Sequence, residues 1–494
     1  MKLNTENLES INSVTLPTYD RSKVTPGIVH IGVGGFHRAH QARYLDDLLN
    51  QGEAFDFGIV GVGLLPFDQK MKDALVSQDY LYTLLERDPF GNEKARVIGS
   101  IIDYIYAPEN PTALIEKMAS PEIKIVSLTI TEGGYNFNQI TGEFIADNPD
   151  IVHDLAHLDA PKTAFAFIYN ALKLRKERGL KPFAVMSCDN VQDNGHMIKL
   201  AITSFAKLVS AQDSSTADIA DFIENEVSFP PTMVDRITPK TTDTDIAYLQ
   251  KTYDIEDDYP VICEDFIQWV IKDDFSAGRP AYEHVGVEVV ANVVPYELMK
   301  LRLLNASHQC LAHFGQLVGD TYVDEAASDP LFKDFLMLYM NEEATHSLDP
   351  LPIDLTAYKQ SLLDRFTNIA IKDTLFRLSE DTSNRIPKMI VPVVNNQLAH
   401  GGSVKYSAAA IAAWAKYCEL IDDNGNEIKM SDPNEAALKA AAAKQKTDKL
   451  AFIRQEIFFG NLAENEVFAA AYLEVLEDLY TIGARKTLEK VVSR

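Results

Sequence analysis

The sequence has 494 residues, of which 46% are apolar and 24% charged, and its formal net charge is −26. This composition is typical of a globular protein that buries a sizeable core, and the length predicts two domains rather than one. The acidic balance, without a compact Lys/Arg cluster, argues against nucleic acid and anionic membrane surfaces as partners, because both carry negative charge.

The four cysteines lie far apart, with neither CxxC spacing nor a nearby pair of histidines: Cys188, Cys263, Cys310 and Cys418. This pattern predicts no disulfide framework and no structural zinc site, and it favours a reducing compartment. The N-terminal residues lack the apolar segment of a signal peptide, and no run reaches the roughly 18 apolar residues of a membrane span. We therefore expect a cytoplasmic protein.

The first half of the chain alternates apolar, β-branched runs with amphipathic segments. Because the runs lack polar alternation, we interpret them as strands buried on both faces of a parallel sheet. The expected strands cover residues 27–34, 57–63, 123–130 and 181–190, and helical segments such as 42–52 and 160–179 lie between them. The alternation predicts an α/β, Rossmann-like N-terminal domain with a doubly wound sheet, which we assign to residues 1–285.

From residue 286 onward the strand signal fades and helical periodicity takes over. The clearest helical segments cover residues 296–319, 354–368, 407–421 and 467–492. The sequence therefore predicts a mainly α-helical C-terminal domain, residues 286–494, that carries the substrate and catalytic groups.

The stretch GIVHIGVGGFHR, residues 27–38, resembles a dinucleotide-binding turn but departs from its pattern. Gly32, Gly34 and Gly35 follow the first expected strand, where glycines let the backbone approach a pyrophosphate at a helix N-terminus. His37 stands where GxGxxG has its third glycine, which widens the helix–strand packing without abolishing phosphate contact. A tight turn without a ligand is the alternative, and the position after the first strand favours the nucleotide site.

After the second expected strand, Asp68 is a candidate acceptor for a ribose hydroxyl. A carboxylate there repels a 2′-phosphate, so it favours NAD over NADP as the cofactor. The alternative is a solvated carboxylate in a surface loop.

The stretch YELMKLRLLNASH, residues 296–308, gathers polar groups on one expected helix. At about 100° per residue, Asn305 lies roughly 140° and His308 roughly 80° from Lys300, so the three share one side. A dehydrogenase of a secondary alcohol needs a base for the hydroxyl proton and donors for the developing alkoxide, roles that a buried lysine and amides can fill. The alternative is a lysine that extends its amine to solvent while the other two bond the backbone.

Tyr296 and Lys300 also have the YxxxK spacing of short-chain dehydrogenases, in which tyrosine is the acid or base. That family keeps the pair within one compact dinucleotide fold of about half this length, whereas here the pair begins a helical domain. We therefore favour Lys300 as the base.

Several motifs, taken together, resemble the polyol-specific long-chain dehydrogenases, most closely the members that act on mannitol. They are GIVHIGVGGFHRAHQ, IVSLTITEGGY, VMSCDNVQDNG, MVDRITPKTTD, QWVIKDDFSAGRP, YELMKLRLLNASH and DRFTN. MVDRITP and the KxxxxNxxH spacing are specific when they occur together, and the resemblance extends over nearly the whole chain.

The resemblance implies metal-independent, NAD-dependent oxidation of D-mannitol to D-fructose and the reverse reduction. The family's lysine base falls on Lys300, and the two asparagines that bind the reacting oxygen fall on Asn190 and Asn305. His308 matches a substrate-binding histidine, and Asp235 of MVDRITP matches an acid of the substrate pocket.

Further positions follow from the same resemblance. Glu297 matches a carboxylate that gates proton release. Arg377 matches an arginine that contacts polyol hydroxyls. Arg385 stands where the family often has lysine, so the resemblance does not define the contacts that Arg385 makes with the substrate. The cofactor positions match Gly34, Gly35, Phe36 and Asp68, although Phe67 replaces a second acid that some relatives carry. Members of the family are often monomers, and we expect a monomer here.

Three alternatives remain open from the sequence. A hexuronate reductase such as fructuronate reductase shares the motifs, and Arg377 with Arg385 could bind a uronate carboxylate. Arabinitol and sorbitol are plausible further substrates. A nucleotide-binding protein without turnover would be expected to have lost part of the catalytic set, whereas Lys300, Asn190, Asn305 and His308 are all present.

Overall fold

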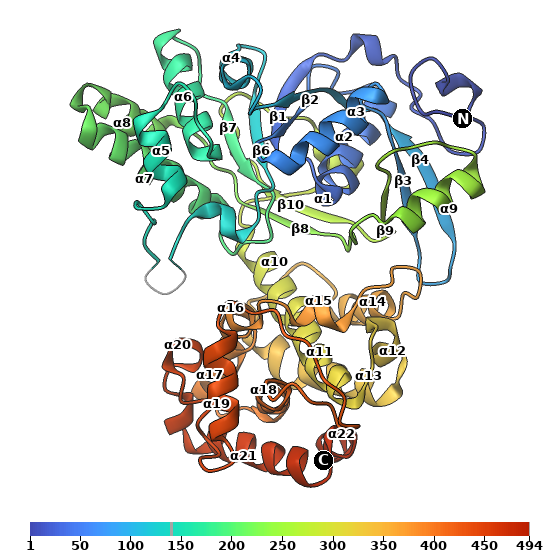
Figure 1. Ribbon diagram of the computed structural model, residues 1–494, viewed down its shortest axis with the longest axis vertical. Coiled ribbons are helices and arrows are strands. Elements are labelled where there is room, and N and C mark those ends of the chain that lie inside the picture. The colour runs from blue at the N-terminus through green and yellow to red at the C-terminus, as the bar shows by residue number, and fades with distance from the viewer. Residues whose placement is uncertain (139–141, 494) are drawn as a thin grey trace. The chain divides into compact units, whose positions relative to one another are not determined.

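The computed structural model describes residues 1–138 and 142–493, which form two compact units (Figure 1). Unit 1 comprises Met1–Asp88 and Asn92–Val293, and unit 2 comprises the residues from Val294 onward together with Pro89–Gly91. The division thus follows Val293 rather than residue 285, because the short strand β11 (Glu288–Val290) pairs with strand β10 (Gln268–Lys272) inside unit 1.

The main sheet of unit 1 has five parallel strands in the order β5-β2-β1-β6-β7. They are β5 (Ile101–Tyr106), β2 (Gly58–Gly63), β1 (Pro26–Ile31), β6 (Ile125–Leu128) and β7 (Ala184–Ser187). The predicted Rossmann-like fold is confirmed, and four of these strands fall in the predicted runs. The sequence did not single out β5, an edge strand in which only Ile101 and Tyr104 are buried.

Both faces of this sheet are buried, which explains why the strands are mostly apolar without regular polar alternation. On β1, Val29 packs into one core and Ile28 into the other. The first core is closed by α4 (Pro111–Ala119), α6 (Ala164–Glu177), α7 (Asn194–Gln212) and α8 (Ala217–Glu226), and the second by α2 (Gln41–Asn50) and α3 (Gln69–Ser77). The remaining helices of unit 1 are α1 (Gly35–Ala39), α5 (Pro149–Ala156) and α9 (Asp243–Tyr253).

Two three-stranded sheets complete unit 1 and line the second core. One has the order β11-β10-β8, with β8 at Thr232–Asp235, and the other has the order β4-β3-β9. The strands of the latter are β4 (Glu93–Ile98), β3 (Tyr82–Arg87) and β9 (Val261–Glu264). The sequence interpretation did not identify these six strands. Three of them, β8, β9 and β11, are only three or four residues long, too short to show a period.

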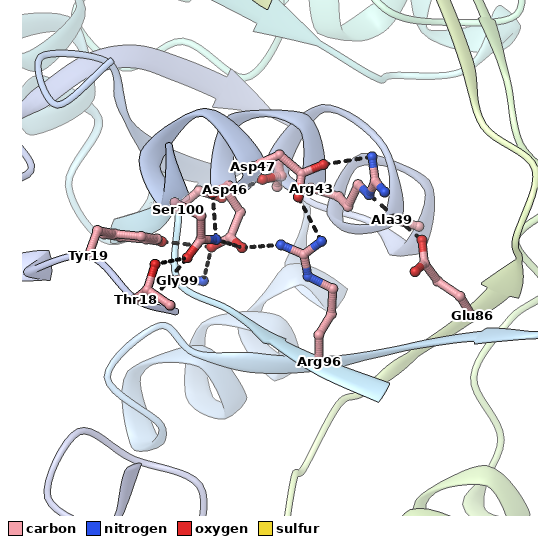
Figure 2. Close-up of polar contacts among 12 residues, drawn as sticks. Thr18, Tyr19, Ala39, Arg43, Asp46, Asp47, Glu86, Arg96, Gly99 and Ser100 are labelled. Carbon is pink, nitrogen blue, oxygen red and sulfur yellow. Dashed lines mark hydrogen bonds and ion pairs between the residues drawn. The ribbon is translucent and has the colours of Figure 1, made fainter. Parts of the chain in front are cut away.

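A buried network of charges fixes α2, the second helix after the glycine turn (Figure 2). Asp46 is fully buried and accepts hydrogen bonds from the Tyr19 hydroxyl (2.7 Å), the Gly99 backbone N–H (2.9 Å) and Arg96 (2.6 Å). Arg96 also donates to Asp47 at 2.7 Å. Because every oxygen of Asp46 has donors, the helix is held to β4 without an unpaired buried charge.

Unit 2 is helical, and no strand occurs among its described residues, so the prediction of a mainly α-helical second domain is confirmed. Its first helix is continuous from α10 (Val294–Met299) through a π-helical segment (Lys300–Asn305) into α11 (Ala306–Val318). The others are α12 (Val323–Ser328), α13 (Pro330–Leu338), α14 (Leu355–Phe366), α15 (Leu375–Ser379), α16 (Thr382–Met389), α17 (Val391–His400), α18 (Lys405–Tyr417), α19 (Glu435–Lys444), α20 (Glu456–Phe459), α21 (Glu466–Thr481) and α22 (Ala484–Val492). α11 and α18 lie at the centre of one large core.

Candidate functional site

A cavity of about 420 Å³ lies in unit 1 at the carboxyl ends of β1, β2 and β6. The chain runs from β1 to β2 and β5 on one side and later crosses to β6 on the other, so the cavity sits at the point where the strand order reverses. Ligands of doubly wound sheets bind at this point. Its lining comprises residues 31–34, 64, 65, 67, 68, 129–131, 133, 134, 136, 148, 150, 151 and 162–165.

The glycines of the turn after β1 have different requirements. Gly32 has φ of +91°, and a methyl group there would lie 2.2 Å from the carbonyl oxygen of Thr129, so the fold itself requires glycine. At Gly34 the nearest atom to such a methyl group would be 4.0 Å away, although this residue lines the cavity. The bare backbone of Gly34 therefore leaves room for a ligand that approaches it closely.

Gly35 and Phe36 begin the short helix α1 and do not line the cavity. A methyl group on Gly35 would make an ordinary 3.5 Å contact with Thr238. The ring of Phe36 stacks on His40, with ring centroids 4.9 Å apart. Of the five predicted cofactor residues, the cavity thus gathers Gly32, Gly34 and Asp68.

His37, at the position of the missing third glycine, packs under the turn. Its ring stacks on that of His30 with centroids 3.4 Å apart, and His30 bonds Ser127 (2.8 Å) and Thr129 (3.1 Å). Burial lowers the pKa of His37 to about 3 and the pKa of His30 well below its ordinary value, so both rings are neutral near pH 7. The two stacked, uncharged rings therefore fill the space between β1 and α1, which a glycine at position 37 would leave for closer packing of the helix on the strand.

Asp68 lies after β2 at the cavity wall and is partly buried. One of its carboxylate oxygens accepts the Leu65 backbone N–H at 2.8 Å. Burial raises the pKa of Asp68, and hydrogen bonds from Leu65 and Leu64 oppose that shift. Phe67, one residue earlier, is 74% exposed and also lines the cavity.

Two residues predicted for the substrate site lie near the ends of β7 and β8. Asn190 is exposed three residues beyond β7, and Asp235, the last residue of β8, is 4% exposed. The amide of Asn194 joins these strand ends by donating to the backbone oxygens of Thr232 (2.9 Å) and Asp189 (3.1 Å). One buried side chain thus fixes the segments that carry Asn190 and Asp235.

In unit 2, Lys300, Asn305 and His308 lie on one continuous helix and are 7%, 8% and 9% exposed. The geometry predicted for a regular α-helix is wrong for residues 300–305, which form a π-helical turn. A π-helix closes hydrogen bonds from i to i+5, so Lys300 and Asn305 span one hydrogen-bonded turn. The Asn305 side-chain N–H₂ is buried and has no hydrogen-bond partner among the residues that the structure describes.

The remaining predicted residues of unit 2 lie on neighbouring helices. Glu297 is partly exposed on α10, one turn before Lys300. Arg377, on α15, is exposed, and two of its nitrogens donate to the two oxygens of Asp373, with Nε at 2.5 Å. Arg385, on α16, donates to the Leu378 carbonyl oxygen at 3.1 Å. The Nε and one Nη nitrogen of Arg377 are therefore already bound to a carboxylate within unit 2.

The sequence interpretation missed the outer wall of the cavity and the residue that holds it. The wall includes Thr131, Asp150, Lys162 and Thr163, and the Asp150 and Lys162 side chains form an ion pair at 3.8 Å. TITEGGY was noted only as a family motif, although its position just after a buried strand could have placed it at the cavity. No local signal marks residues 148–165, because they reach the cavity only through the folding of a long segment.

No group of three or more His, Cys, Asp or Glu among the described residues is arranged to hold a metal ion. None of the helices in the described part of the chain is long and apolar enough to cross a membrane.

Comparison with known proteins finds two family models along the chain. The Rossmann-domain model of mannitol dehydrogenase matches residues 26–284, and the C-terminal-domain model matches residues 292–480. Among curated relatives, mannitol 2-dehydrogenase of Phaeosphaeria nodorum is 44% identical over 99% of this chain and 85% of that protein. Mannitol dehydrogenase 2 of Saccharomyces cerevisiae is 41% identical over 100% and 98%.

Two solved structures share the fold along almost the whole chain. Pseudomonas fluorescens mannitol 2-dehydrogenase, in a ternary complex with NAD and D-mannitol, is 44% identical with a TM-score of 0.90 and covers 100% of both chains. A substrate-free D-sorbitol dehydrogenase is 34% identical with a TM-score of 0.90 and covers 98% of this chain and 100% of that one. The chain belongs to the mannitol dehydrogenase family.

Proposed function

We propose that the protein catalyses the NAD-dependent oxidation of D-mannitol to D-fructose and the reverse reduction, without a metal ion. The observation that carries the proposal is in unit 2. Lys300 is buried there, and the buried side-chain N–H₂ of Asn305, one π-turn further on, has no hydrogen-bond partner in the described part of the chain. An unpaired buried donor is costly, so such a group is expected to await a ligand oxygen. The relatives named for mannitol and the relative holding NAD and D-mannitol support the substrate and cofactor.

The residues of unit 1 fit a dinucleotide. The Gly34 backbone offers a close approach for a pyrophosphate, Gly32 makes the turn, and Asp68 offers a carboxylate to the ribose hydroxyls. We retain Gly35 and Phe36, the first residues of α1, as cofactor-binding residues. A bound nicotinamide cofactor accepts or delivers the hydride of the reaction.

Proton transfer falls to Lys300 in this proposal. Its amine removes the hydroxyl proton during oxidation, while Asn305 and Asn190 donate hydrogen bonds to the oxygen as negative charge develops there. Glu297, partly exposed one turn earlier, passes the proton between Lys300 and solvent.

The other hydroxyls of the substrate are assigned to His308, Asp235, Arg377 and Arg385. Arg377 favours a polyol over a uronate, because Asp373 occupies the Nε side of its guanidinium and offsets its positive charge. Fructuronate reduction is the alternative, and arabinitol and sorbitol remain candidate secondary substrates. We also retain a cytoplasmic monomer as the expected state.

Initial rates with the purified protein test this proposal. We expect fast reduction of D-fructose with NADH, slow reduction of D-fructuronate, and lower kcat/KM with NADPH. A preference for fructuronate would keep the Lys300 chemistry and reject the polyol assignment. Binding of NADH without turnover of any polyol or ketose would instead support a non-catalytic nucleotide-binding protein.

Replacing Asp68 with asparagine should shift the cofactor preference toward NADPH. The variant removes both a charged acceptor for the ribose hydroxyls and the repulsion of a 2′-phosphate, so the ratio of kcat/KM for NADH over NADPH should fall about tenfold or more. Asp73→Asn on α3 removes the same charge from an exposed side chain outside the cavity. An equal change in both variants would mean that only net charge matters.

A further inference from the structure

The loop after β6 has a backbone conformation that a threonine rarely adopts. Thr131 has φ of +62° and ψ of 168°, a region populated almost only by glycine, and residues held there carry strain of about 1–3 kcal/mol. Ile130 and Thr131 both line the cavity of unit 1. Something outside the loop must hold this conformation, because the loop alone would relax from it.

The carboxylate of Asp189 provides that restraint. Asp189 is 7% exposed, and its two oxygens accept separate backbone N–H groups, Ile130 at 3.1 Å and Thr131 at 2.8 Å. The Tyr135 hydroxyl donates to the same carboxylate at 2.8 Å, which closes the loop from its far end. Asp189 also directly precedes Asn190, so one short segment joins the cavity wall to a proposed substrate residue.

We propose that Asp189 is a positioning residue of the cofactor site, whose carboxylate holds Ile130 and Thr131 in the conformation that forms one wall of the cavity. The inference rests on the proposed function, since the cavity is taken as the cofactor site. Asp189 acts through the backbone of the loop and is not among the residues that line the cavity.

The geometry makes asparagine an informative replacement. An amide has a single acceptor oxygen, so Asp189→Asn can satisfy only one of the two backbone N–H groups and turns an N–H₂ donor toward the other. The loop should then relax, and the dissociation constant for NADH, measured by fluorescence titration, should rise about tenfold or more.

The chain offers a matched control in Asp257. This residue is 2% exposed in unit 1, does not line the cavity, and likewise accepts two backbone N–H groups on separate oxygens, those of Thr83 and Tyr259. Asp257→Asn should lower Tm by a similar amount and leave NADH affinity unchanged. Equal losses of affinity in the two variants would overturn the proposal, because they would reveal only a general loss of stability.

Relief of the backbone strain supplies a rescue test. Glycine adopts the φ of Thr131 without strain, so Thr131→Gly placed on Asp189→Asn should restore part of the lost NADH affinity. The same glycine placed on Asp257→Asn should restore none. A double variant as weak as Asp189→Asn alone would contradict the role assigned to the loop.

The pH dependence of cofactor binding gives an independent readout. Burial raises the pKa of Asp189 to about 6, and the titratable groups that influence it are Tyr135 and Glu132. Protonation converts one acceptor oxygen into a donor, so NADH affinity of the wild type should fall as pH falls through about 6, and Asp189→Asn should lack this step. Unfolding through this group cannot cause the fall, because a pKa raised by folding makes its protonation stabilising.

Amide hydrogen exchange separates failure of this inference from failure of the proposed function. The peptide containing Ile130 and Thr131 should exchange faster in Asp189→Asn than in the wild type or Asp257→Asn, with no cofactor present. Wild-type protein that bound no NADH would refute the cofactor assignment, and the exchange rates would still test the restraint. Unchanged exchange at these amides in Asp189→Asn would overturn it.

Discussion

Lys300→Met is expected to lower kcat for mannitol oxidation by about 10²- to 10⁴-fold, the usual contribution of a positioned general base. Methionine keeps much of the length and the helix propensity of lysine but has no amine. Because Lys300 is 7% exposed, the replacement should fill the same buried space, so Tm and the dissociation constant for NADH should change little. Stopped-flow and steady-state rates in both directions measure the effect.

A second buried lysine provides the control. Lys359 is also 7% exposed in unit 2, and its amine donates a hydrogen bond to the Asn341 side-chain oxygen at 2.6 Å. Lys359→Met should therefore change stability more than kcat. In Lys300→Ala, which leaves space at the helix, added small primary amines should restore part of the rate. Near-normal kcat in Lys300→Met, or no difference between the two methionine variants, would reject Lys300 as the base.

The main sheet could be predicted because burial on both faces leaves a strong mark on the sequence. The runs around Ile28 and Ile125 are mostly apolar and rich in β-branched residues, since alternate residues enter different cores. The edge strand β5 and the short strands β8, β9 and β11 leave weaker marks, because few of their residues define a period. Their positions depend on pairing between distant segments, which a local pattern does not encode.

The candidate site was predictable only where chemistry and spacing coincide in one segment. Lys300, Asn305 and His308 could be found together because a single helix carries them, although the π-turn at 300–305 was not foreseen. A π-turn contains one more residue than an α-helical turn, so it rotates the following residues about the helix axis. The apolar pattern of the sequence does not reveal it. Asp189 shows the opposite case, because its importance arises from two N–H groups almost sixty residues earlier in the chain.

Gly34→Ala is expected to weaken NADH binding by about 10- to 100-fold without unfolding the protein. The backbone at Gly34 is extended, with φ of −102°, and a methyl group there would meet no atom of the protein closer than 4.0 Å. Alanine is therefore compatible with the fold. The methyl group would occupy part of the cavity wall against which a pyrophosphate is proposed to lie, and such overpacking costs about 1–3 kcal/mol.

Gly32→Ala separates the requirement of the ligand from that of the fold. A methyl group at Gly32 would clash with the Thr129 carbonyl oxygen and force alanine to a φ of +91°, so this variant should lose about 2 kcal/mol or more of unfolding free energy. Gly34→Ala should keep the wild-type Tm while losing affinity. If Gly34→Ala bound NADH as tightly as the wild type, no ligand would approach the backbone there, and the glycine turn would serve only the packing of β1 against β6.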